Sequence, residues 1–337
     1  MSDKNTKKRF TAVISSWRQI QLQNFTSWDK LASFLQWPEK DKEKVLKKAI
    51  FPLNLPFRLA QKAETNTLQD PNLKQFLPSL EELSSPSNFS LDPVQDKNFQ
   101  KAGSKLLHKY RGRALLVTTS ACVMNCRFCF RKNFAYEELG KDFSKEIQII
   151  QQDPSLKEII LSGGDPLSLS DASLEKLLQD LDNIPHIQRI RFHSRFPIGI
   201  PERIDASFLK ILSSLQKQVV FILHVNHPKE LDNDIYQAMK SLQKIGIPVL
   251  TQSVLLQGVN DSADTLQKLF EDLSDHGIIP YYLHQLDRVQ GAAHFEVSEE
   301  TGKQLMKELS TRISGYSLPR YVKEEPGKPS KTSISFL

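Results

Sequence analysis

Six short apolar runs, rich in β-branched residues, alternate with amphipathic segments across the middle of the chain. The runs occupy 114–119, 158–162, 189–193, 219–225, 248–255 and 279–283. The segments with helical spacing of apolar residues occupy 144–152, 172–181, 206–215, 230–245 and 263–276. Strands that alternate with helices form parallel β/α units, and right-handed crossovers curl such a sheet towards a barrel. We therefore predict an α/β fold, a partial (β/α)6 barrel with its chemistry at the carboxyl ends of the strands.

The flanking segments differ from this central pattern. Apolar residues recur at helical spacing over 17–35 and 41–50, and several prolines follow. We expect residues 1–100 to form an N-terminal helical cap, 101–300 to form the barrel core, and 301–337 to form a C-terminal helix and tail.

The charge and hydropathy patterns limit the classes of partner. The chain has 45 Lys and Arg residues against 39 Asp and Glu, a formal net charge of +6, which permits anionic partners without requiring nucleic acid. The polar, basic start has no apolar stretch behind it, so it does not resemble a secretory signal. The longest apolar run, near 219–223, is too short to cross a membrane. We expect a cytoplasmic protein with no membrane or nucleic-acid partner.

All three cysteines lie within eight residues, directly after the first predicted strand, as Cys122, Cys126 and Cys129. Three thiolates can hold three irons of a [4Fe–4S] cluster and leave the fourth iron open to a small molecule. A zinc site completed by a distant histidine is an alternative. The odd number of cysteines argues against a disulfide.

Polar clusters also follow the later strands. Gly163, Gly164 and Asp165 follow the second strand, His193 and Ser194 end the third, and a His-Val-Asn-His-Pro stretch begins at His224 on the fourth. Because parallel strands bring their carboxyl ends to one edge, such clusters assemble a site. A metallohydrolase that uses His193, His224 and His227 as ligands remains an alternative at this level.

The Cys-x3-Cys-x2-Cys spacing after an apolar strand resembles that of the radical S-adenosylmethionine (SAM) superfamily. With Arg131, the Gly-Gly-Asp turn, His-x-Asn-His-Pro and Gln-Ser-Val-Leu-Leu-x-Gly-Val-Asn-Asp, the stretch 92–331 resembles the lysine 2,3-aminomutase family. The resemblance implies a [4Fe–4S] cluster on the three cysteines, an electron donor to reduce it, and SAM bound at the open iron. The residues that it implies for the SAM pocket are Gly163, Gly164, Asp165, Ser194, His224 and Gln252.

The same resemblance implies pyridoxal 5′-phosphate (PLP) as a further cofactor. Its catalytic lysine would be Lys331, which follows a Pro-Gly-rich loop, with Lys328 as the second candidate. Tyr110 and Arg113 match positions near the PLP phosphate, and an arginine suits a phosphate dianion through paired hydrogen bonds.

The implied substrate is L-lysine. Arg131 would hold the substrate carboxylate, and Asp287 and Glu324 would hold the ε-ammonium, because a buried ammonium without an anionic partner is unfavourable. The reaction would convert L-lysine to (R)-β-lysine. The lack of further cysteines and the short tail resemble the branch of the family that supplies β-lysine for elongation factor P and its lysyl ligase. Alternatives are a catabolic aminomutase, a radical SAM enzyme that modifies RNA, and a zinc-stabilised binding module.

Overall fold

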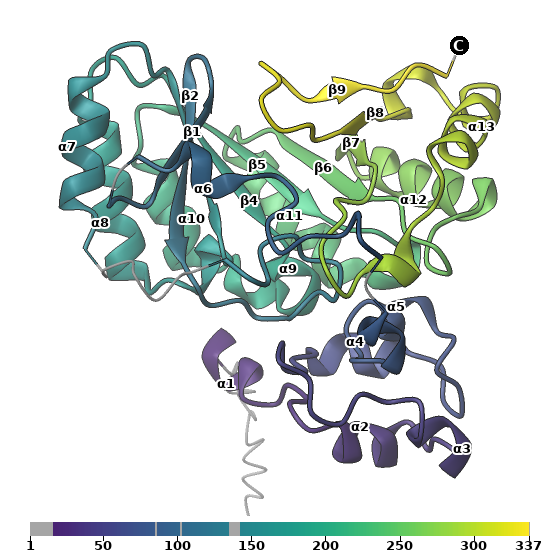
Figure 1. The fold of residues 1–337 in the computed structure, drawn as a ribbon. Coiled ribbons are helices and arrows are strands. Elements are labelled where there is room, and N and C mark those ends of the chain that lie inside the picture. Colours follow the sequence, from purple (N-terminus) through teal and green to yellow (C-terminus); the bar gives the residue numbers. More distant parts are fainter. Residues whose placement is uncertain (1–15, 85, 102, 135–141, 337) are drawn as a thin grey trace, which may run out of the picture.

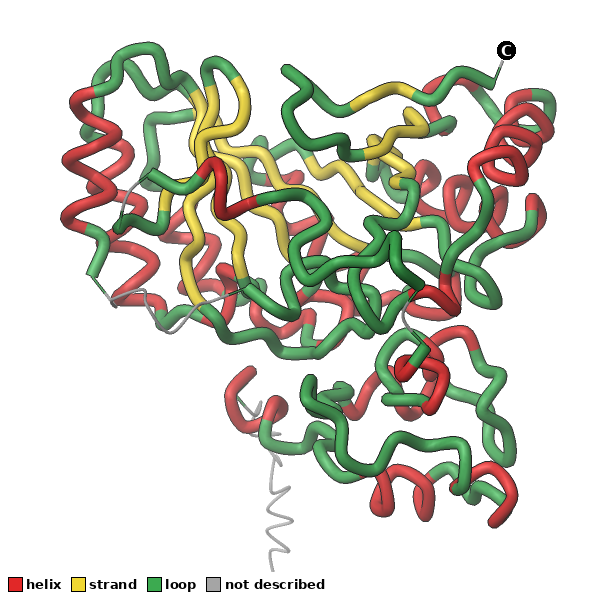
Figure 2. The backbone as a smooth tube through the Cα atoms, in the orientation of Figure 1, coloured by secondary structure: helices red, strands yellow, loops and turns green. Residues whose placement is uncertain are grey.

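One sheet organises the computed structural model, which describes residues 16–84, 86–101, 103–134 and 142–336 (Figures 1 and 2). The polar start of the chain lies outside these residues. Over the described residues, nine strands form the sheet in chain order. The strands are β1 (Leu106–Tyr110), β2 (Arg113–Thr119), β3 (Glu158–Gly163), β4 (Arg189–Ser194), β5 (Gln218–His224), β6 (Val249–Val254), β7 (Ile279–His284), β8 (Arg320–Lys323) and β9 (Thr332–Ser333).

Strands β2 to β8 run parallel, and the two edge strands run antiparallel to their neighbours. A long helix follows each strand from β2 to β7, which gives six β/α units with β8 as an added strand. These helices are α7 (Ser144–Gln152), α8 (Asp171–Asp182), α10 (Ala206–Ser213), α11 (Asn233–Lys244), α12 (Ala263–Asp275) and α13 (Glu299–Ser310). Over the described residues β1 and β9 form the two open edges of the sheet and do not pair with each other. The barrel is therefore partial, and the predicted fold class is confirmed.

Short polar side chains begin most of these helices. Asp205 Oδ1 accepts a hydrogen bond from the Phe208 N–H at 2.8 Å, and Asp232 Oδ1 accepts one from the Ile235 N–H at 3.1 Å. Serines begin α8, α12 and α13 in the same way. Such caps satisfy backbone donors that lack partners in the first helical turn. No helix of the described ranges is long and apolar enough to cross a membrane.

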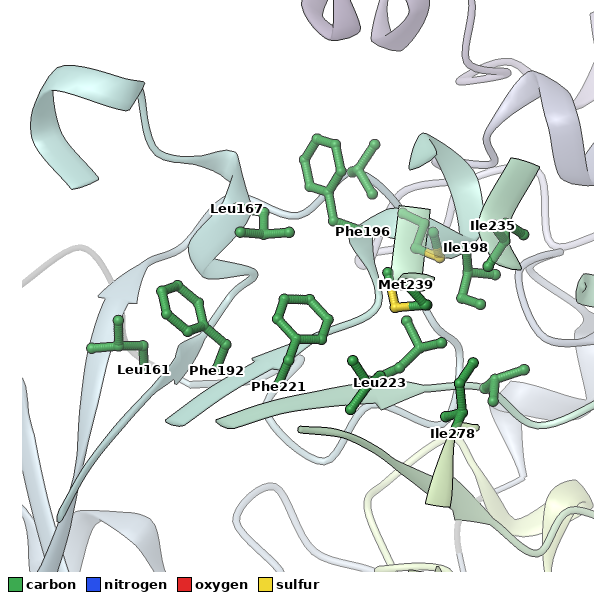
Figure 3. Packing of buried hydrophobic residues seen from close by; sticks show 14 of the residues in the cluster. Leu161, Leu167, Phe192, Phe196, Ile198, Phe221, Leu223, Ile235, Met239 and Ile278 are labelled. Carbon is green, nitrogen blue, oxygen red and sulfur yellow. The ribbon is translucent and has the colours of Figure 1, made fainter. Parts of the chain in front are cut away.

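The main core lies between the sheet and its surrounding helices. Phe192 of β4 stacks on Phe221 of β5, with ring centroids 6.1 Å apart, and both side chains are fully buried. Leu223 of β5 and Met239 of α11 continue this layer (Figure 3). Since successive strand residues point to opposite faces, these apolar residues leave the alternate positions for the interior of the barrel.

The N-terminal region differs from the predicted helices over 17–35 and 41–50. The structure instead has α1 (Trp17–Gln21), α2 (Trp28–Phe34) and the short α3 (Glu39–Lys42), followed by α4 (Phe57–Lys62), α5 (Pro71–Lys74) and α6 (Asp96–Phe99). The chain bends between α1 and α2, where the Asn24 side chain donates to the Val123 carbonyl at 2.7 Å. A long-range contact therefore overrides the local helical pattern.

Candidate active site

A cavity of about 620 Å³ occupies the inside of the partial barrel. Because side chains alternate between the two faces of a strand, every second residue of a strand faces the cavity. On β4, Arg191 and His193 line the cavity, whereas the alternate residues Ile190 and Phe192 are buried in the outer core. Every residue predicted for the site lines this one cavity. These residues are Tyr110, Arg113, Cys122, Cys126, Cys129, Arg131, Gly163, Gly164, Asp165, Ser194, His224, Gln252, Asp287, Glu324 and Lys331.

The cysteine loop is held by the N-terminal region as well as by the barrel. The Asn54 side chain donates to the Cys122 carbonyl at 3.2 Å, and the Asn125 N–H donates to the Asn54 carbonyl at 3.0 Å. Farther along the loop, Arg127 is 1% exposed and its Nε donates to Glu82 Oε1 at 2.8 Å. These contacts fix the backbone that presents the three thiols to the cavity.

The three thiols form no disulfide. Burial raises the pKa of Cys122, Cys126 and Cys129, that of Cys129 to about 11. Cationic irons would displace these protons, as metals do at thiol sites. A cube binds each cysteine at a different iron, so the sulfurs need not converge on one point. The loop therefore fits a [4Fe–4S] cluster.

The structure gives no support to the two alternatives with a single metal ion, the zinc site and the metallohydrolase. Among the residues that the structure describes, no group of three or more His, Cys, Asp or Glu side chains is arranged to hold one metal ion. His227, one of the three candidate histidines, instead accepts the Lys229 N–H at its Nδ1 and so caps the turn η5 (Pro228–Glu230).

The Gly-Gly-Asp turn packs tightly against the start of the cysteine loop. The Gly164 N–H donates to the Thr119 carbonyl at 2.7 Å, and the Asp165 N–H donates to the Ala121 carbonyl at 2.8 Å. A Cβ on Gly164 would lie 2.4 Å from the Ala121 oxygen, so a side chain has no room there. The turn thus fixes the strand ends beside Cys122.

The carboxylate of Asp165 is occupied by groups of the protein itself. It accepts hydrogen bonds from the Ser194 hydroxyl at 2.8 Å and from the N–H groups of Leu167, Arg195 and Phe196 at 3.0, 2.8 and 3.0 Å. Burial nevertheless raises its pKa, because desolvation outweighs these bonds. In this structure Asp165 and Ser194 join the ends of β3 and β4. A direct contact of either side chain with SAM stays a prediction.

Three neutral histidines line the cavity at the ends of their strands. Burial lowers the pKa of His193, His224 and His284 well below the usual value. The buried Nε2 atoms of His193 and His224 have no hydrogen-bond partner within the described part of the chain. Buried polar atoms normally have one, so these two nitrogens suit a bound ligand. With Gln252 on β6, they fit a pocket for SAM.

The C-terminal tail places Lys331 inside the cavity, whereas Lys328 is exposed on the preceding turn. Lys331 Nζ donates to Glu324 Oε2 at 2.9 Å, and Tyr110 Oη donates to Glu324 Oε1 at 2.6 Å. The Arg113 guanidinium lies over the Tyr110 ring, 4.6 Å from its centroid. An amine between acidic and cationic side chains fits a cofactor that carries an aldehyde and a phosphate.

Opposite charges connect this tail to the cysteine loop. Lys109 Nζ lies 3.4 Å from Glu324 Oε1 and 3.2 Å from Asp96 Oδ1, and Arg131 Nε donates to Asp96 Oδ2 at 2.7 Å. Burial opposes ionisation of Asp96, but the Arg131 and Lys109 charges outweigh it and lower its pKa. This chain of charges extends from a point two residues after Cys129 to Lys331.

Sequence reasoning missed several residues of the site. Asp96 and Lys109 lie in the cavity wall, and Arg195 and Glu230 form a buried pair at 2.8 Å beside the cysteines. No motif singles out Asp96 or Glu230, since the cationic side chains that pair with them lie at least 13 residues away in sequence. For Arg195 a signal existed, because it directly follows Ser194 at a strand end.

Comparisons with known proteins identify the family of the chain. A profile described as the radical SAM superfamily matches residues 116–272. L-lysine 2,3-aminomutase of Escherichia coli (strain K12) is 43% identical over 290 residues, which cover 85% of this chain and 84% of that protein. The protein of the same name from Haemophilus influenzae (strain ATCC 51907 / DSM 11121 / KW20 / Rd) is 40% identical over 322 residues, 94% of this chain and 95% of the relative. The chain belongs to the lysine 2,3-aminomutase family of radical SAM proteins.

Proposed function

We propose that this protein converts L-lysine to β-lysine by moving the amino group from Cα to Cβ, with a [4Fe–4S] cluster, SAM and PLP. The observation that carries the proposal is the pairing of Lys331 Nζ with Glu324 at 2.9 Å, inside the cavity that the three cysteines line. The Glu324 carboxylate thus binds a lysine ammonium, which is the group at the far end of a lysine substrate.

The cysteine loop and the strand ends serve the radical half of the reaction. When bound, the cluster and SAM supply a carbon-centred radical that removes hydrogen from the substrate. Cys122, Cys126 and Cys129 would hold the cluster, and the unpartnered nitrogen of His224 would orient SAM.

The tail serves the half of the reaction in which nitrogen moves. When bound, PLP supplies a π system through which the nitrogen passes between the carbons. Lys331 would hold the PLP aldehyde carbon and Arg113 its phosphate. Tyr110 would keep Glu324 oriented through its hydroxyl hydrogen bond.

Charge supports lysine as the substrate. Arg131, fixed by Asp96, would bind the substrate carboxylate, and Asp287 and Glu324 would bind the ε-ammonium. Burying an ammonium without an anion is unfavourable, so two acids at one end of the cavity favour a diamine acid over a neutral amino acid.

The test is conversion of L-lysine by anaerobically reconstituted protein with SAM, PLP and dithionite. We expect β-lysine as the product, and borohydride should trap PLP on Lys331. Lys331→Ala should abolish both, whereas Lys328→Ala should retain both, because Lys328 is exposed. A fully loaded protein that consumes SAM and forms no β-lysine would contradict the proposal.

We further propose that the product is (R)-β-lysine and that it is used to modify elongation factor P. The support is resemblance: the chain matches 95% of the Haemophilus influenzae relative but 78% of the one from Clostridium subterminale. Elongation factor P and its lysyl ligase should accept the purified product faster than L-lysine, as measured by the mass of the modified factor. Equal rates would contradict this role.

A further inference from the structure

The guanidinium of Arg195 touches a sulfur of the cysteine loop. Arg195 follows β4, and its Nη1 donates to Cys126 Sγ at 2.9 Å. Its Nη2 donates to Gln75 Oε1 at 2.6 Å and to Glu230 Oε2 at 2.8 Å. The side chain is 7% exposed, so the contact is shielded from water.

The anionic partner of Arg195 is fixed by the backbone around it. Glu230 is 0% exposed, and its Oε1 accepts the N–H groups of Asn226 and His227 at 3.0 and 2.9 Å. Gln75 Nε2 donates to the same oxygen at 3.1 Å. Because Glu230 cannot turn away, the guanidinium that it binds has a defined direction.

Two aromatic rings fix the guanidinium further. Its central carbon lies 4.8 Å from the Phe76 ring centroid and 5.5 Å from that of Phe128. A buried Arg–Glu pair alone would have a purely structural reading. The hydrogen bond to Cys126 adds something else, since it acts on a sulfur that the radical SAM motif makes a cluster ligand.

We propose that Arg195 is a positioning residue that raises the reduction potential of the cluster by donating a hydrogen bond to Cys126 Sγ. One electron from a low-potential donor reduces the cluster from [4Fe–4S]2+ to [4Fe–4S]1+, and the added negative charge spreads over its sulfurs. Hydrogen bonds to these sulfurs stabilise the reduced form. The guanidinium keeps its protons throughout. The proposal rests on the radical SAM assignment and is independent of the substrate.

The test is a redox titration of anaerobically reconstituted protein without lysine, followed by the electron paramagnetic resonance signal of the reduced cluster. In Arg195→Gln we expect the reduced-to-oxidised ratio at a fixed potential to fall about tenfold, which is about 59 mV for a one-electron couple. Iron and sulfide contents are measured in the same samples, so loss of cluster is distinguished from a change in potential.

Arg203→Gln is the matched control. Arg203 is also fully buried and pairs with Asp171 at 3.0 Å, but its hydrogen bonds go to the carbonyls of Leu167 and Leu169 instead of a sulfur. This variant should keep the wild-type potential. Wild-type potential in fully loaded Arg195→Gln would overturn the proposal, whatever the protein does with lysine.

Glu230→Gln covers the case in which Arg195→Gln does not retain a cluster. It keeps the guanidinium and removes the buried negative charge that faces it, so the charge near Cys126 becomes more positive. The potential should then rise. An unchanged potential in a fully loaded Glu230→Gln protein would show that this network does not act on the cluster.

Discussion

Asp287 differs in its ionisation from Glu324, the other acid proposed for the substrate ammonium. Burial raises its pKa to about 6, and the negative charge of Glu324 adds to this effect, while the positive charge of Lys331 opposes it. Burial also acts to raise the pKa of Glu324, yet Lys331 and Tyr110 outweigh it and lower that pKa. Near neutral pH both acids are therefore ionised, but only Asp287 gains a proton as the solution becomes mildly acidic.

This difference predicts an acid limb in the pH dependence of lysine turnover. Protonation below pH 6 neutralises Asp287, so kcat/KM for lysine should rise with pH through about 6 and should be about tenfold below its plateau at pH 5. Asp287→Asn should remove this limb and lower the plateau. The exposed Asp275→Asn variant should keep the wild-type profile. A wild-type limb that persists in Asp287→Asn would assign it to another group.

The loops after β2 and β3 act together as one element. Gly163 has φ +109°, a conformation that favours glycine, and Gly164 packs on the carbonyls of Thr119 and Ala121. Those carbonyls directly precede Cys122. The Gly-Gly-Asp turn therefore supports the cysteine loop from the barrel side, in addition to any contact with SAM.

Gly164→Ala tests this support. Its Cβ would lie 2.4 Å and 2.8 Å from two backbone oxygens, which cannot yield as a flexible side chain can. We expect a loss of about 1–3 kcal/mol in the free energy of unfolding, as for other overpacked sites, and a lower iron content after reconstitution. Urea unfolding of the apoprotein and iron analysis measure the two effects.

Gly315→Ala provides the comparison, because a Cβ at Gly315 has open space around it. It should leave the unfolding midpoint and the iron content close to those of the wild type. If Gly164→Ala behaves like Gly315→Ala, the close packing of the turn has no bearing on the cysteine loop.

The sequence predicted best those strands and helices in which apolar residues recur at the spacing of one buried face. The six central strands and the helices after them match their predicted bounds closely, because one face of each is apolar. β1, β8 and β9 were missed. β8 has only four residues, two of them Arg320 and Lys323, and β9 has two. Their pairing follows from neighbouring strands, which local pattern does not encode.

The residues that line the cavity could be predicted from local motifs, whereas the residues that hold the cysteine loop in place could not. Cysteines, glycines and histidines at strand ends form recognisable local motifs. Gln75, Glu82 and Glu230 act through side chains 35 to 155 positions away, and their local sequence has nothing unusual. The fold, and not the local sequence, brings these residues to the cysteine loop.

At the scale of the molecule, the N-terminal region lies beside the barrel (Figure 1). Several ion pairs join the two parts, and two of these contacts differ in what they hold. At the first, Glu82 of η1 (Leu80–Leu83) pairs with Arg127 of the cysteine loop. At the second, Arg58 of α4 pairs with Asp232 at 2.7 Å and with Glu202 at 3.1 Å. Only the first contact reaches the loop that carries the cysteines. The two contacts can therefore be separated by mutation.

Glu82→Gln should loosen the cysteine loop without changing a cluster ligand. Arg127 would keep its bond to the Phe51 carbonyl at 2.7 Å but lose its buried anion, and breaking such a pair costs about 3–5 kcal/mol. We expect iron to leave the reconstituted protein for a chelator several-fold faster than from the wild type, under anaerobic conditions. Arg58→Gln breaks the other contact, whose Arg58 side chain is 22% exposed, and should release iron at close to the wild-type rate. If iron release were equally faster in both variants, docking of the whole N-terminal region, and not the Glu82–Arg127 pair, would protect the cluster.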